Sequence, residues 1–130
     1  MDSTTSEQHP YFPSGDWEGV YLYENGPGAE RHPMSFELNF REGKITGSGG
    51  DDVGPFSWEG SYDVLSMAVK MLKSYPAHQV LYTGMADSSG IYGTWQLSFA
   101  RGGFHIWPKT NEREEQAVAV GEKEKEVSVV

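Results

Sequence analysis

The chain has 130 residues, which is enough for one domain with a real core and too few for two. Its formal net charge of −9 disfavours nucleic acid and anionic membrane surfaces as partners, because long-range electrostatics would repel both. It contains no cysteine, which excludes disulfides, thiolate catalysis and cysteine-ligated metal sites and favours a cytoplasmic location.

Both ends of the chain differ in composition from its middle. Residues 1–14 are polar and lack the basic and apolar regions of a secretory signal, so we expect a flexible tail. Residues 15–108 carry almost all of the aromatic bulk and are expected to form the folded domain. Residues 109–130 are highly charged and are expected to be disordered, or transiently helical around residues 112–120.

Apolar and polar residues alternate with a period of two through the first half of the domain, which is typical of strands with one buried face. Four such runs, each closed by turn residues, cover residues 17–23, 34–40, 44–49 and 56–64. The last is the clearest, because large aromatic residues alternate there with Ser57, Glu59 and Ser61. Each run therefore predicts a strand.

Four further runs follow in the second half, over residues 67–73, 78–84, 91–97 and 104–107. The first of them, MAVKMLK, also fits a helix, but seven residues between turns are short for one. We predict a strand with Met67, Val69, Met71 and Lys73 on the same face.

Short connections decide how these eight strands pair. All are within hairpin range except the first, and parallel pairing would need crossovers of a dozen residues or more. An antiparallel meander with one apolar face hides that face and both edges by curling shut, so we predict an all-β fold, an eight-stranded up-and-down β-barrel. Gly19, Gly60 and Gly93 would then leave room for inward rings. A two-sheet sandwich is the alternative.

The segments GDWEGVY (residues 15–21) and IYGTWQL (residues 91–97) resemble the Gly-x-Trp strands of avidin- and streptavidin-like barrels, a motif also found in lipocalins. The resemblance covers the core and implies a calycin-type barrel. It does not imply biotin binding, because the strand after Trp17 offers Tyr21 and Tyr23 where avidins place small amides and hydroxyls.

The segment GSGGDDVGPFSWEG (residues 47–60) is rich in glycine and aspartate and connects two predicted strands. It lacks the ending of a phosphate loop and the spacing of an EF-hand. Asp51 and Asp52 are adjacent, so extended geometry points them apart. We predict a turn, with a weak cation or substrate contact as the alternative. No metal site and no cofactor are predicted.

Odd-numbered connections of a meander lie at one end of the barrel, and the longer loops belong to this set. Eight strands enclose a space that side chains just fill or that holds one small ligand. The candidate ligand-binding residues are the inward polar and aromatic groups and those near this rim: Tyr21, Tyr23, Trp58, Tyr62, Lys73, His78, Tyr82 and Trp95. Lys73 would favour a carboxylate.

Three functions follow from these residues. The first is a non-catalytic barrel that binds a small, partly apolar or aromatic ligand. The second is an enzyme of the isomerase or cyclase type, in which His78 or a tyrosine moves a proton, although no catalytic motif identifies the residue. The third is a filled barrel that serves as a protein-interaction module. The sequence does not fix the oligomeric state, and a dimer is compatible with it.

Overall fold

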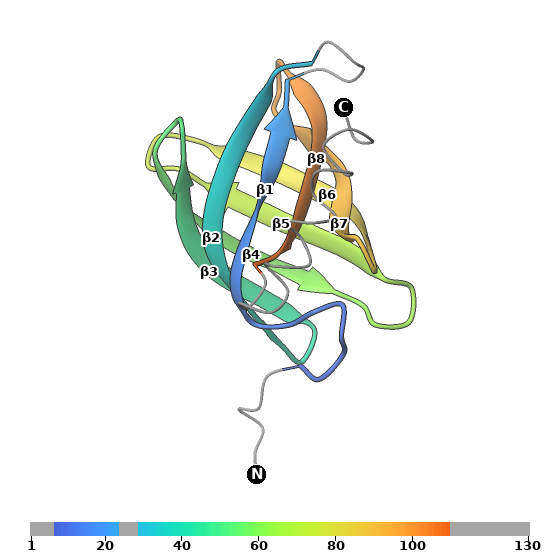
Figure 1. Ribbon diagram of the computed structural model, residues 1–130. Helices are drawn as coiled ribbons and strands as arrows, with labels where there is room; N and C mark the ends of the chain where they lie inside the picture. The colour runs from blue at the N-terminus through green and yellow to red at the C-terminus, as the bar shows by residue number, and fades with distance from the viewer. Residues whose placement is uncertain (1–6, 24–28, 110–130) are drawn as a thin grey trace, which may run out of the picture.

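The computed structural model describes residues 7–23 and 29–109, which form a closed barrel of eight antiparallel strands (Figure 1). Each strand pairs with the next along the chain. The strands are β1 (Gly15–Leu22), β2 (Arg31–Arg41), β3 (Lys44–Asp51), β4 (Pro55–Tyr62), β5 (Ala68–Ser74), β6 (Gln79–Asp87), β7 (Gly90–Gln96) and β8 (Arg101–Pro108).

Pairing between the first and last strands closes the barrel. β1 and β8 run antiparallel, with Trp17 opposite Pro108 and Tyr21 opposite Phe104. This pairing confirms the predicted up-and-down barrel and excludes the two-sheet sandwich, because no edge strand remains. The ambiguous segment MAVKMLK forms β5 from Ala68 onward, as predicted, and is not helical.

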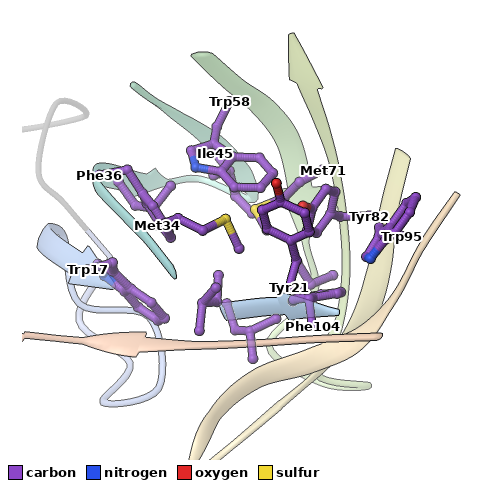
Figure 2. Close-up of a cluster of buried hydrophobic side chains, with 14 of the residues drawn as sticks. Trp17, Tyr21, Met34, Phe36, Ile45, Trp58, Met71, Tyr82, Trp95 and Phe104 are labelled. Atoms are coloured by element: carbon purple, nitrogen blue, oxygen red, sulfur yellow. The ribbon is translucent and has the colours of Figure 1, made fainter. Parts of the chain in front are cut away.

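The predicted inward face is the buried one. Trp17, Trp58 and Trp95 come from β1, β4 and β7, and each is at most 2% exposed. Figure 2 shows how the core is filled: Trp17 lies at one side of the cluster, whereas Trp95 lies with Tyr21 at the other. Large rings therefore fill the interior.

The three inward glycines have a different role from the predicted one. A Cβ atom built on Gly60 would collide with the carbonyl oxygen of Lys70 on β5, and one built on Gly93 would collide with that of Thr83 on β6. One built on Gly19 would collide with the carbonyl oxygen of His105 on β8. The obstacle is the backbone of the neighbouring strand and not an aromatic ring. These glycines let adjacent strands approach closely where the barrel coils.

Residues 7–14, within the segment for which a tail was expected, pack across the end of the barrel at which β1 begins (Figure 1). Phe12 is fully buried there, with its ring 4.6 Å from that of Tyr62 and 5.4 Å from that of Phe40. The mostly polar composition of the segment hides this role, which Phe12 carries with Tyr11 packed beside the core. We call this the closed end.

Hydrogen bonds fix the segment in place. The backbone N–H of Glu7 donates to the carbonyl oxygen of Phe40 at 2.8 Å, and the hydroxyl of Tyr62 donates to Oε1 of Glu7 at 2.6 Å. The indole N–H of Trp17 donates to the carbonyl oxygen of Pro13. The other end of the barrel, from which the connections β1–β2, β3–β4, β5–β6 and β7–β8 leave, is called the open end.

The transient helix expected around residues 112–120 lies outside the described residues. Within residues 7–23 and 29–109, no helix is long and apolar enough to cross a membrane.

Candidate binding site at the open end of the barrel

A buried ion pair lies at the open end. The ammonium nitrogen Nζ of Lys73, on β5, is 2.5 Å from Oδ2 of Asp51, the last residue of β3. The Lys73 side chain is 1% exposed and that of Asp51 is fully buried. Removing two charges from water is costly, so the pair persists only because each charge finds a partner and further hydrogen bonds.

Three other side chains complete the environment of this pair. The hydroxyl of Tyr75 donates to Oδ2 of Asp51 at 2.5 Å. The Lys73 ammonium also lies 3.3 Å from the Tyr82 hydroxyl oxygen and 3.3 Å from Sδ of Met34. All of these groups come from strands or strand ends, so the rigid barrel fixes their positions.

Burial governs the protonation of this cluster. Desolvation lowers the pKa of Lys73, and the carboxylate of Asp51 opposes that effect. Burial raises the pKa of Tyr75 and Tyr82 well above the ordinary value, assisted by the negative charge of Asp51. Both tyrosine hydroxyls therefore remain protonated at any physiological pH, Tyr75 donating to Asp51 and Tyr82 accepting from Lys73.

Aromatic rings surround the ammonium group as well. Nζ of Lys73 lies 4.4 Å from the ring centre of Phe56, 4.6 Å from that of Tyr21 and 5.0 Å from that of Tyr75. These distances are within the range of cation–π attraction. The barrel interior thus already contains one ammonium group, that of Lys73, surrounded by aromatic rings.

A second carboxylate, that of Asp52, lies nearer the surface and links β1 to β2 through its hydrogen bonds. Oδ1 of Asp52 accepts a hydrogen bond from the hydroxyl of Tyr21 at 2.7 Å, and Oδ2 lies 2.6 Å from Nδ1 of His32. The rings of Tyr21 and His32 stack, with centres 4.8 Å apart. Burial would raise the pKa of Asp52, but the hydrogen bonds to Tyr21 and His32 outweigh it and lower that pKa.

A recess opens above these groups. Its volume is about 30 Å³, which is room for about two water molecules. Nine residues line it, and none of them is a lysine, an arginine, an aspartate or a glutamate: Tyr21, Tyr23, Val53, Tyr75, His78, Val80, Tyr82, Trp95 and Leu97. The recess is therefore aromatic, with hydroxyl groups and one imidazole.

The structure brings most of the predicted site residues together but not all of them. The predicted residues that line the recess are Tyr21, Tyr23, His78, Tyr82 and Trp95. Lys73 and Trp58 lie directly beneath it, since the ring of Trp58 meets that of Tyr82 edge-on at 4.9 Å.

Tyr62 does not belong to this group. It lies at the closed end beside Phe12, so its place in the predicted site is not supported by the geometry. His78 is exposed and stacks on Tyr75, with ring centres 4.8 Å apart. Among the described residues, no tyrosine or acid forms a hydrogen bond with the His78 ring, so nothing positions it as a general base.

Three residues of the site were missed by sequence reasoning. The turn predicted within residues 47–60 is present, because Asp51 and Gly54 exchange backbone hydrogen bonds. Its two aspartates nevertheless have structural partners. The signal was available for Asp51, because it continues the inward phase of Ile45, Gly47 and Gly49. His32 lies outside the strand predicted over residues 34–40, but the structure places it on β2, in the inward phase.

No group of three or more His, Asp or Glu side chains in residues 7–23 and 29–109 is arranged to hold a metal ion. Comparison with known proteins found no match to this chain among protein-family models, curated proteins or solved structures.

Proposed function

We propose that this protein is a non-catalytic, streptavidin-like binding barrel that holds one end of a small, partly aromatic ligand in the recess at its open end. The single observation that carries the proposal is the recess itself, which is lined mainly by aromatic side chains. Most of these rings are buried, but Tyr23 is 47% exposed at the rim.

The size of the recess limits what enters it. With a volume of about 30 Å³, it accepts a compact end group and leaves the rest of a ligand outside, against the loops of the open end. The buried pair of Lys73 and Asp51 acts as a rigid floor. Because Asp51 already neutralises Lys73, the carboxylate preference expected from Lys73 loses its basis.

The two alternatives have less support. An isomerase or cyclase needs a positioned proton-transfer group, and the exposed ring of His78 is not positioned by a partner in the described part of the chain. The interaction-module prediction stays a prediction.

A fragment screen by NMR tests the proposal. We expect fragments with a small aromatic or alkyl end to shift the indole N–H signal of Trp95, which is held by a 2.7 Å hydrogen bond to the Leu22 carbonyl oxygen at the edge of the recess. Replacement of Tyr23 by alanine should weaken binding. Tyr92→Ala is the matched control, since Tyr92 is 42% exposed on the outer wall. A diverse screen in which no fragment moves Trp95 would contradict the proposal.

A further inference from the structure

The connection between β4 and β5, at the closed end, presents an apolar side chain to solvent. Leu65 lies in the middle of this connection and is 91% exposed. Hydrogen bonds fix the shape of the turn: the backbone N–H of Asp63 donates to the carbonyl oxygen of Ala68 at 3.0 Å, and that of Met67 donates to the carbonyl oxygen of Asp63 at 2.7 Å. Because the turn is already ordered, little conformational entropy is lost when a partner covers Leu65.

An open groove with a volume of about 530 Å³ lies beside this turn. Ser61, Lys70 and Thr83 line it from β4, β5 and β6, where they are direct neighbours across the three strands. The turn contributes Asp63 to the same lining, whereas Leu65 lies outside it. The leucine of the chain itself therefore does not fill the groove next to it.

A protruding side chain beside a groove is what a two-fold symmetric dimer uses. In such a dimer both copies contribute the same surface, so each copy inserts its own side chain and receives that of the other. Two reciprocal insertions would bury both copies of Leu65. Exposed apolar side chains adjoin this surface, namely Val64 in the turn and Met85 opposite Ala68 of the groove.

The charges of this surface are complementary to themselves. Its lining carries one carboxylate, that of Asp63, and one ammonium group, that of Lys70. Within the described residues, Lys70 forms no ion pair. When the turn of one copy enters the groove of the other, Asp63 of the first approaches Lys70 of the second, and the reciprocal pair forms at the same time. A partner with charges of one sign would match only one of these groups, so the charge pattern favours a second copy of this chain.

We propose that this protein forms a two-fold symmetric dimer in which Leu65 of each copy occupies the groove lined by Ser61, Lys70 and Thr83 of the other. The contact surface lies at the closed end and leaves the recess at the open end free. The inference is therefore independent of the proposed binding function.

Sedimentation equilibrium tests the dimer. We expect the natural protein to be dimeric at about 100 µM. Leu65→Asp should raise the dissociation constant about a hundredfold or more, because both copies lose an apolar contact and would have to bury a charge. Folding should be unaffected, since this side chain lies in water in the monomer. Phe99→Asp is the matched control, because Phe99 is equally apolar and exposed but lies at the open end, and it should leave the dissociation constant unchanged.

A mixture of two variants tests the reciprocal geometry. Ser61→Trp, on the exposed side of β4, fills the groove and should make the protein monomeric. Leu65→Ala removes the inserted side chain and should weaken the dimer about tenfold or more. Together they should form a heterodimer tighter than either homodimer, because the natural Leu65 of one copy meets an open groove and the added ring of that copy meets the space left by alanine.

A natural protein that stays monomeric at about 1 mM would overturn the proposal. A dimer that Leu65→Asp leaves intact would also overturn it, because the contact would then lie elsewhere on the molecule. Equal weakening by Leu65→Asp and Phe99→Asp would attribute the loss to added charge and not to the insertion of Leu65. A mixture that associates no more tightly than its components would exclude the reciprocal arrangement.

Discussion

The two ends of this barrel fill the same kind of space with opposite chemistry. At the closed end, the ring of Phe12 packs on Phe40 and Tyr62, and the chain itself covers the opening. At the open end, an ion pair between Lys73 and Asp51 fills the interior, and tyrosine hydroxyls satisfy the remaining hydrogen bonds. The buried ring of Phe12 stabilises the closed end through burial of apolar surface. The ion pair and its hydrogen bonds instead fix the positions of polar side chains. Only the second arrangement leaves a recess with defined chemistry above it.

The largest expected effect comes from breaking the polar floor. Lys73→Met should lower the free energy of unfolding by about 3–5 kcal/mol, because it leaves the buried carboxylate of Asp51 without its cation. Chemical denaturation measures this loss. Lys70→Met, on the outer face of the same strand, is the matched control and should cost less than about 0.5 kcal/mol.

The double variant Lys73→Met with Asp51→Asn sharpens the result. It should be more stable than Lys73→Met alone, because no buried charge remains unpaired. If Lys73→Met alone were as stable as the natural protein, the ion pair of Lys73 and Asp51 would not be what fills the open end.

Removal of the plug comes next in size. Phe12→Ala should cost about 3 kcal/mol, at the lower end of the range for buried phenylalanine, because a segment at the end of the barrel relaxes more easily than a central strand. Phe99→Ala is the control, since Phe99 is 83% exposed, and thermal denaturation compares the two. Equal stability of both variants would mean that residues 7–14 do not close the barrel in solution.

A smaller effect is expected from the hydroxyl of Tyr62. Tyr62→Phe removes its hydrogen bond to Glu7 and should cost about 1 kcal/mol at neutral pH. Burial, together with that hydrogen bond, raises the pKa of Tyr62 from 10.0 to about 12.

The sign of the pH dependence follows from this pKa. Between the two values the folded protein keeps a proton that the unfolded chain releases, so stability falls as pH rises through this interval. Denaturation measured across it should show a shallower decline for Tyr62→Phe than for the natural protein. An unchanged slope would contradict the assigned role of Tyr62.

The smallest effect concerns Asp52 at the open end. Its folded pKa is below the ordinary 3.8, so its contribution to stability is present above that pH and is lost as pH falls further. Asp52→Asn should therefore be less stable than the natural protein near neutral pH, and the two should converge in acid. A constant difference across that range would show that the Asp52 charge does not bind Tyr21 and His32 together.

Period-two alternation and short connections determined the strands and their order, because side chains on a pleated strand must alternate between water and core. The inward phase of Trp17, Trp58 and Trp95 follows from the same rule, as do Lys73 and Tyr82 at the site. Extended by two residues at the ends of the predicted strands, the same alternation would have placed Asp51 and His32 inward as well. Which face each residue occupies is therefore determined by the local sequence.

Partners across the barrel were decided only by the tertiary structure. Asp51 and Lys73 are 22 residues apart, and Tyr62 and Glu7 are 55 apart. Neither contact follows from alternation, because closure and strand coiling set which inward groups meet. The same holds for the burial of Phe12: two adjacent rings, Tyr11 and Phe12, in a polar segment show no period, and Phe12 packs because the barrel leaves an apolar opening at this end.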